Sequence, residues 1–474
     1  MWLMVPFILN SLLNFVVSLL VAKFLGPAEY GRFALALTAA VVTQTLVFDW
    51  LRLAATRFYS ERDRAEHPEI RATLDTALGA LAALVAVAAL AVWALRLDLA
   101  LTPDLAALAI VVAVANGGFD FSCAILRARF LDRAYGALVI VKNVLAFALT
   151  VGGAFAFGSA KIALLGMTIS VAGSLVSARA NLVDANTGWR RAERGLALRF
   201  LAYGLPIVIA NFVYQTVPLV NRTLVSQTQG FADAGQLSLA YEIGIRIVGA
   251  IGSALDVILF QIAVLAEKTT GVDEARAQVA RNIGVVFAVV TPAVAGCWLI
   301  LPSFEHLFVP ESFRGPFAHY FALTLPALFA FAMMNYAVHP AFQIAHRLTP
   351  LVIAALVACV ANFFAILLLP ATGDATKYAM AQSISTCAGL SALVVMMLAL
   401  APMWPRARDI LGAALASALM LAAATPLRAM TPGVVALIVQ IAVGVAVYGA
   451  SAFALDIARL RSVIWPKLAA KLAR

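Results

Sequence analysis

The sequence has few charged residues. Only 12% of its 474 residues are Asp, Glu, Lys or Arg, whereas 63% are hydrophobic. A water-soluble domain usually has about a quarter of its residues charged, so water is excluded as the main solvent. Apolar runs of about 20 residues, the length of a membrane-crossing helix, recur from end to end. They are continuous rather than alternating with a period of two, which excludes a membrane β-barrel. We therefore expect an all-α polytopic membrane protein.

Cysteine and histidine are scarce and scattered. The 4 cysteines lie far apart inside apolar runs, and the 5 histidines occur singly. No CxxC or Cys/His spacing is present, so neither a disulfide nor a metal site is predicted. The sequence also lacks the Walker A, GxSxG and HExxH patterns. We expect no ATP hydrolysis, no cofactor and no enzymatic activity.

Fourteen membrane spans are predicted. They lie near residues 3–23, 32–52, 74–95, 105–126, 135–157, 161–181, 200–222, 236–260, 282–301, 319–342, 350–369, 378–401, 409–426 and 434–456. The segments after even-numbered spans, such as 57–71 and 188–199, contain most of the 34 Lys and Arg residues. Because basic loops mark the cytoplasmic side, both termini are predicted to be cytoplasmic. The net charge of +10 then reflects topology and does not indicate nucleic-acid binding.

An internal repeat divides the first twelve spans into six and six. The segment GPAEYGRFALA (26–36) follows span 1, and GFADAGQLSLA (230–240) follows span 7. The matched pairs are Gly26/Gly230, Ala28/Ala232, Gly31/Gly235, Leu35/Leu239 and Ala36/Ala240. Six helices per repeat keep both halves in the same orientation, which makes a parallel repeat. We predict an N-terminal lobe (1–199), a C-terminal lobe (200–408) and an appended helix pair with a basic cytoplasmic tail (409–474).

Two segments resemble a known family. FLGPAEYGRFALA (24–36) and GLPIVIANFVYQTVPLVNRTLVSQTQG (204–230), followed by DAGQLSLAYEIGIRI (233–247), are similar to the corresponding regions of Wzx-type O-antigen and exopolysaccharide flippases. These belong to the MOP flippase superfamily, together with lipid II flippases and MATE antiporters. The resemblance implies two six-helix lobes around a central cavity that opens alternately to the two sides. It also implies a substrate, a polyprenyl-pyrophosphate-linked oligosaccharide, and a place in the bacterial inner membrane, beside membrane lipids and with polysaccharide polymerase and chain-length proteins as partners.

Charged residues within the spans are the candidate site. An ionised side chain at the centre of a membrane helix costs about 2.5–3.5 kcal/mol on insertion scales. Arg246 follows Gly235 by eleven residues, roughly 16 Å along a helix, and so lies near mid-membrane. Glu242 is one turn away and can pair with it. A guanidinium donates bidentate hydrogen bonds to phosphate, so Arg246 is the first candidate for substrate binding and Glu242 for a charge-partner or coupling role.

Two further pairs lie closer to the cytoplasmic side. Asp120 and Lys142 occur at similar depth in neighbouring spans, and Asp49 and Arg52 are three residues apart in span 2. Each pair either neutralises itself structurally or supplies a cation, Arg52 or Lys142, to a phosphate.

Polar residues in span 7 form a third group. Asn211, Gln215 and Arg222 fall near one helical face, which either lines a sugar path or bonds to neighbouring helices. Flippases of this kind usually have an aspartate before the arginine at this position. This chain has Asn221 before Arg222, which puts a coupling role of Arg222 in doubt.

Two other functions remain as alternatives. A MATE-like, cation-coupled small-molecule antiporter shares the fold but usually has twelve helices. A membrane glycosyltransferase or polymerase needs a sizeable loop or domain outside the membrane, and the longest loops here, near 53–73, 182–199 and 302–318, are short. The sequence identifies neither the sugar unit nor the energy source.

Overall fold

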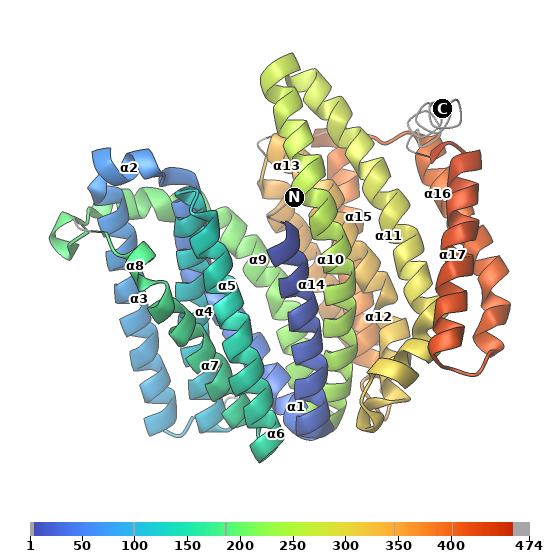
Figure 1. Ribbon diagram of the computed structural model, residues 1–474, viewed down its shortest axis with the longest axis horizontal. Helices are drawn as coiled ribbons and strands as arrows, with labels where there is room; N and C mark the ends of the chain where they lie inside the picture. The colour runs from blue at the N-terminus through green and yellow to red at the C-terminus, as the bar shows by residue number, and fades with distance from the viewer. Residues whose placement is uncertain (1–3, 98–99, 185–186, 346, 401, 458–474) are drawn as a thin grey trace. The chain divides into compact units, whose positions relative to one another are not determined.

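The chain is a set of helices joined by short connections (Figure 1). The computed structural model describes residues 4–97, 100–184, 187–345, 347–400 and 402–457, and no β-strand occurs within them. A helix satisfies all its backbone hydrogen bonds internally, as a segment surrounded by lipid must. The span-length helices and helix groups are α1 (Met4–Phe58), α3 (Pro68–Ala94), α4 (Pro103–Ala128), α5–η1–α6 (Asp132–Phe157), α7 (Ala160–Ser177), α9 (Arg194–Thr228), α10 (Phe231–Thr270), α11 (Val272–Phe308), α12–η4–α13 (Pro316–Ile344), α14 (Thr349–Leu368), α15 (Thr376–Leu400), α16 (Ala407–Ala424) and α17 (Val434–Ala454). Short helices α2 (Glu61–Glu66) and α8 (Arg179–Leu182) and the 3₁₀ turns η2 (Trp189–Arg191), η3 (Glu311–Phe313) and η5 (Thr425–Ala429) lie between them.

The number of spans agrees with the sequence prediction. In the described part of the chain, 13 helices are long and apolar enough to cross a membrane. The first of them belongs to α1, whose 55 residues include a break at Gly26 (φ 69°), followed by Pro27. The break divides α1 into two pieces, each long enough to span, so the fourteen predicted spans and the all-α polytopic class are confirmed. The basic tail after Ile457 lies outside the described residues.

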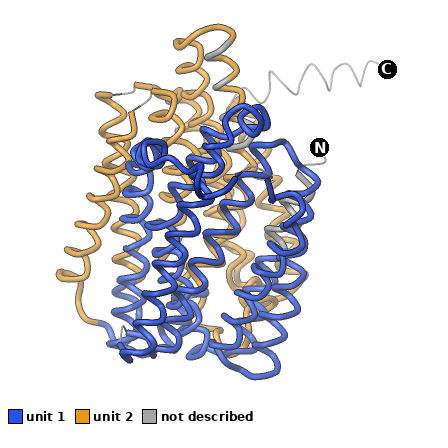
Figure 2. Tube along the Cα trace, turned by 90° about the vertical axis from the view of Figure 1, so that its left-hand side faces the viewer, with its two compact units in different colours: residues 1–239, 372–378 blue, residues 240–371, 379–474 orange. Residues whose placement is uncertain are grey.

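The helices form two compact units (Figure 2). Unit 1 comprises residues 1–239 and 372–378, and unit 2 comprises residues 240–371 and 379–474. Within unit 1, α1 packs against α4 and α9, α3 against α4, and α5 against α7. The predicted lobes, 1–199 and 200–408, follow the sequence repeat rather than these packing contacts, and they stay a prediction.

The two matched segments of the repeat, 26–36 and 230–240, contact each other within unit 1 through glycines; we call them the glycine junctions. Gly26 and Gly230 both have positive φ, 69° and 97°, a conformation that side chains disfavour. Five residues after each, Gly31 and Gly235 face one another's backbone. A Cβ added to Gly31 would lie 1.9 Å from the carbonyl oxygen of Phe231, and one added to Gly235 would lie 2.1 Å from that of Pro27. The matched glycines therefore let the start of α10 cross α1 in backbone contact.

In unit 2, α16 and α17 form a hairpin that packs on α11 (Figure 1). Small residues such as Ala413 and Ala416 make the contact close. The Tyr448 hydroxyl donates to the carbonyl oxygen of Ala288, and the Gln440 side-chain amide donates to that of Leu427 at 3.0 Å. The Tyr448 contact thus ties the hairpin to α11 by a hydrogen bond as well as by packing, whereas the Gln440 contact lies within the hairpin.

Candidate functional site

Two of the predicted charged pairs meet in one cluster within unit 1. Asp49 and Arg52 lie on α1, where Arg52 Nε is 3.5 Å from Asp49 Oδ1, so the predicted i,i+3 ion pair is confirmed. Asp120 on α4 accepts a hydrogen bond from Gln44 Nε2 at 2.7 Å. The carboxylate of Asp120 also interacts electrostatically with Arg52 and Lys142. These four charged residues, together with Gln44, form what we call the α1–α4–α5 cluster.

Lys142 lies beside an aromatic ring. Its Nζ is 5.2 Å from the centre of the Phe119 ring, a cation–π distance. Gln44 donates a hydrogen bond to Asp120, and the charges of Arg52 and Lys142 also act on that carboxylate. The predicted Asp120–Lys142 pair thus belongs to a larger cluster, and its direct contact stays a prediction. The Arg52 side chain keeps 33% of its surface exposed, which leaves room for an anionic ligand.

Arg222 on α9 lies deep in unit 1. It is only 7% exposed. Its Nη1 donates to the Thr38 hydroxyl and lies 3.5 Å from the carbonyl oxygen of Ala34, both on α1. In this conformation the guanidinium links α9 to α1, and substrate contact by Arg222 would require local rearrangement.

The polar residues of α9 have different surroundings. Asn211 is partly buried, whereas Gln215 is exposed. The hydroxyl of Tyr214, between them in the sequence, is enclosed without a hydrogen-bond partner among the described residues. Prolines at 206 and 218 lie within the same helix. One turn of α9 thus presents polar groups that are not all used by the fold.

Arg246 on α10 has one unsatisfied guanidinium nitrogen. Its Nε is enclosed by protein, and no described residue accepts a hydrogen bond from it. Glu242, one turn away, has an interaction partner, and its predicted pairing with Arg246 stays a prediction. A buried charge-bearing donor without a partner costs free energy. Arg246 therefore keeps one unused donor, and a ligand would reach it only after local rearrangement.

A second charged network lies at the end of unit 1 that the loop charges predict to be cytoplasmic. Asp184, only 5% exposed in its side chain, accepts a hydrogen bond from Arg64 and lies 3.9 Å from Arg129 Nη1. Its other oxygen accepts from the Tyr59 hydroxyl at 2.8 Å. Arg129 Nε in turn donates to Glu61 at 2.8 Å. Nothing in the sequence pattern singles out Asp184, and the only signal is the density of charge in the loops.

The titration of this network follows from its contacts. The hydrogen bond from Arg129 lowers the pKa of Glu61 below its usual value of 4.5. Because the pKa of Glu61 is lower in the folded state than in the unfolded state, this contact stabilises the fold at pH values above the unfolded-state pKa. The stabilisation is lost as the pH falls through the folded-state pKa. Burial, then the hydrogen bond to Asp184, raise the pKa of Tyr59, so its hydroxyl stays a donor at neutral pH.

Replacing Asp184 by asparagine is expected to destabilise unit 1. The change removes the charge that pairs with Arg64 and lies 3.9 Å from buried Arg129, which keeps only its contact with Glu61. Breaking a buried ion pair typically costs about 3–5 kcal/mol, and the retained Glu61 contact places the expected loss near or below the lower end. The thermal unfolding midpoint of the purified protein in detergent measures the effect. Glu66→Gln is the control, since the Arg62–Glu66 pair is exposed on both sides and such pairs contribute about 0–1 kcal/mol. Equal midpoints for the two variants would show that the network contributes nothing to stability.

No metal centre is visible in the part of the chain that the structure describes. No three His, Cys, Asp or Glu side chains there are grouped so that they could hold an ion. What the described residues offer is cationic and polar groups within membrane-length helices. Such groups suit the binding and passage of an anionic, hydroxyl-rich molecule.

Known structures share this fold. The lipid II flippase MurJ in an inward closed conformation aligns with a TM-score of 0.74, at 13% identity, over 98% of this chain and 99% of that chain. A multidrug resistance MATE family transporter of the MOP superfamily aligns with TM-scores of 0.51 facing inward and 0.52 facing outward, both at 14% identity. Those matches cover 86% and 88% of this chain and 94% of theirs. At such identities the likeness shows the fold.

Sequence comparison identifies the family. No curated protein sequence matches the chain. The profile described as polysaccharide biosynthesis protein matches residues 1–260, more than half of the 474. That region contains both glycine junctions and Arg246. The chain belongs to the polysaccharide biosynthesis protein family, and it has the fold of multi-pass transporters of the MOP superfamily.

Proposed function

We propose that the protein translocates polyprenyl-pyrophosphate-linked oligosaccharides across the bacterial inner membrane by alternating access. The flipped units would serve the synthesis of surface polysaccharide or lipopolysaccharide. Membership in the polysaccharide biosynthesis family supports this function. The likeness to a lipid II flippase over 98% of the chain, appended helix pair included, agrees with it.

The observation that carries the proposal is Nε of the Arg246 guanidinium, from which no described residue accepts a hydrogen bond. A pyrophosphate group cannot cross hydrocarbon without compensation for its charge. A guanidinium supplies that compensation through bidentate, charge-assisted hydrogen bonds, which are stronger in a site of low dielectric constant. Arg246 would bind the pyrophosphate during passage, once the helices around Nε have moved, and the lack of an acceptor for Nε among the described residues favours that binding.

The other candidate residues take secondary roles. Arg52 and Lys142 of the α1–α4–α5 cluster would receive the phosphate closer to the cytoplasmic side, in exchange for Asp49 and Asp120. Glu242 would act near Arg246 as Asp49 and Asp120 act in the cluster, as the acidic group that the phosphate displaces. Asn211 and Gln215 would contact sugar hydroxyls, and Arg222 would contact substrate near the opposite mouth after leaving Thr38. No cofactor takes part in this scheme.

The setting of the protein is also part of the proposal. Both termini would lie in the cytoplasm, as the basic loops indicate. The flipped units would then be used by a polysaccharide polymerase and chain-length proteins outside the membrane.

A MATE-like antiporter is the alternative. It is supported by the shared fold, with TM-scores of 0.51 and 0.52. Those alignments leave out 12–14% of this chain, consistent with the appended helix pair that a twelve-helix antiporter lacks. Recognition of organic cations also calls for free acidic groups. The α1–α4–α5 cluster instead holds its two acids beside two cations.

Depletion of the protein in its native host tests the function. We expect lipid-linked oligosaccharide to accumulate on the cytoplasmic leaflet while surface polymer is lost, and the wild-type gene to restore both. Ethidium retention in the same cells tests the antiporter alternative. Unchanged surface polymer together with increased ethidium retention would overturn the flippase proposal.

A further inference from the structure

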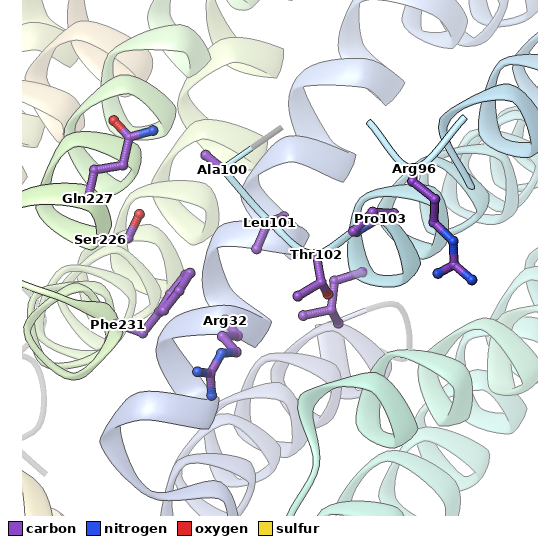
Figure 3. Close-up of a pocket in the computed structure, with 10 residues that line it drawn as sticks. Arg32, Arg96, Ala100, Leu101, Thr102, Pro103, Ser226, Gln227 and Phe231 are labelled. Atoms are coloured by element: carbon purple, nitrogen blue, oxygen red, sulfur yellow. The ribbon is translucent and has the colours of Figure 1, made fainter. Parts of the chain in front are cut away.

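A pocket of about 640 Å³ opens at one end of unit 1, away from the α1–α4–α5 cluster. Figure 3 shows Ser226, Gln227 and Phe231 on one side, from the end of α9 and the start of α10. The connection between α3 and α4, with Arg96 and Thr102, forms the other side, and Arg32 of α1 lies between them. The loop charges predict this end to be the non-cytoplasmic one. Its size is within the range of about 300–1,000 Å³ that is typical of ligand pockets.

The first cation of the pocket is held in place by its neighbours. Arg32 forms an ion pair with Glu29, and its guanidinium carbon lies 4.9 Å from the centre of the Phe231 ring. Glu29 is fixed in turn, because its Oε2 accepts a hydrogen bond from the backbone N of Ala160 at 2.9 Å. Because Oε2 is used at the start of α7, Glu29 contacts Arg32 through Oε1 on Nη1, and the other N–H groups of Arg32 are not used by this pair. Arg32 is a positioned cation with donors to spare.

The second cation is more weakly held. Arg96 is 71% exposed, and its nearest described carboxylate, Asp104, is 4.0 Å away. Asp104 is closer to Lys161, at 2.8 Å. The backbone of Arg96 has φ 51°, the left-handed conformation that commonly ends a helix, and Leu97 N donates to the carbonyl oxygen of Val92 at 3.1 Å. The end of α3 thus sets the position of Arg96 beside the pocket.

Uncharged groups complete the pocket. Thr102 is the N-cap residue of α4, but its hydroxyl makes no capping hydrogen bond. The amide of Gln227 is exposed. The Ser226 hydroxyl donates to Thr223 at 2.8 Å and can still accept. Two guanidinium groups with two hydroxyls and an amide form a site for a ligand that has both negative charge and many hydroxyls.

We propose that this pocket binds an anionic sugar residue, one that bears a carboxylate or a phosphate. The cations would bind the acidic group with charge-assisted hydrogen bonds, and the hydroxyl and amide groups would bind the ring hydroxyls. A volume of about 640 Å³ accommodates more than a single small anion. That the bound sugar belongs to the glycan being translocated rests on the function proposed above.

Binding to the purified full-length protein in detergent tests the pocket. The probes are trigalacturonic acid, neutral maltotriose of equal length, and inorganic phosphate, each titrated by calorimetry at low salt. We expect trigalacturonic acid to bind and maltotriose to bind far more weakly. Arg96→Gln should weaken trigalacturonic acid binding by about tenfold or more, since one charge-assisted contact is lost.

Arg190→Gln is the matched control. Arg190 is exposed and lies over its neighbour Trp189 at 5.5 Å, as Arg96 lies over Trp93 at 5.8 Å, but it is not part of the pocket. The control variant should bind trigalacturonic acid like the wild type. Phosphate affinity equal to that for trigalacturonic acid would reduce the pocket to a site for anions only and overturn the proposal, as would unchanged binding in Arg96→Gln.

The two proposals can fail separately. Arg246→Ala, outside the pocket, should lose translocation in cells and keep trigalacturonic acid binding in vitro. Retained translocation in that variant would count against the role of Arg246 and leave the pocket intact. If Arg96→Gln lost trigalacturonic acid binding while Arg246→Ala made normal polymer, the pocket would be supported and the transport role of Arg246 would not.

Discussion

Arg246→Ala is expected to lower surface polysaccharide by about 10- to 100-fold, with lipid-linked units accumulating inside and normal protein abundance in the membrane. The expected size follows from hydrogen bonds to charged groups, which contribute about 1.5–3 kcal/mol each. Arg246 Nε has no acceptor among the described residues, so removing this nitrogen breaks no hydrogen bond seen there. Arg246→Lys keeps the charge but not the bidentate geometry, so its polymer level should be intermediate.

The control for this prediction is Arg276→Ala. Arg276 also belongs to unit 2, but it is exposed at the start of α11 and pairs with exposed Asp273 at 3.5 Å. Polymer should stay at the wild-type level. If Arg246→Ala also gave normal polymer at normal abundance, Arg246 would be demoted to a structural residue. Arg52 and Lys142 would then be the next phosphate candidates.

Gly235→Ala is expected to disrupt the crossing of α1 and the start of α10. The new Cβ would lie 2.1 Å from the carbonyl oxygen of Pro27. That atom belongs to the backbone, so the two helices must separate. Overpacking of this kind costs about 1–3 kcal/mol, and more where the backbone cannot yield. We expect a thermal midpoint several degrees lower in detergent, with a smaller monodisperse fraction on size-exclusion chromatography.

Gly79→Ala provides the matched control. Gly79 is exposed on the membrane-length helix α3, and a Cβ there meets no atom within 4 Å. Alanine favours a helix over glycine by about 1 kcal/mol, so this variant should be as stable as the wild type or slightly more so. Matching behaviour of the two variants would show that the crossing tolerates a methyl group.

Hydropathy predicts this fold well because a chain surrounded by lipid can adopt few backbone conformations. A segment that cannot hydrogen-bond to its solvent must be helical, so apolar length alone locates spans such as 105–126, observed as α4. The glycine repeat was also informative. Gly26 and Gly230 share a backbone conformation that follows from residue type. What the sequence did not indicate was that the other matched glycines, Gly31 and Gly235, touch.

Side-chain partners were harder to predict. The Asp49–Arg52 pair was correct because three residues within one helix set the distance. The hydrogen bond from Gln44 to Asp120 was not predicted, because it depends on the rotation of neighbouring helices, which no local pattern encodes. Asp184 was missed for the same reason. Its partners come from three other segments. The functional roles of all these residues stay predictions.

Unit 1 is built from two parts of the chain that lie far apart in the sequence, and this affects how the protein is synthesised. Residues 372–378 belong to it, and Gln229 Nε2 donates to the carbonyl oxygen of Thr372 at 3.1 Å, while the hydroxyls of Thr228 and Tyr378 lie 3.3 Å apart. A ribosome that has passed residue 239 must add about 130 more residues before this segment exists. At about 5–20 residues per second, segment 372–378 is synthesised about 7–26 seconds after the end of α9. During that interval the nascent protein exposes unpaired polar groups, and this is when insertion factors and quality-control proteases have access to it.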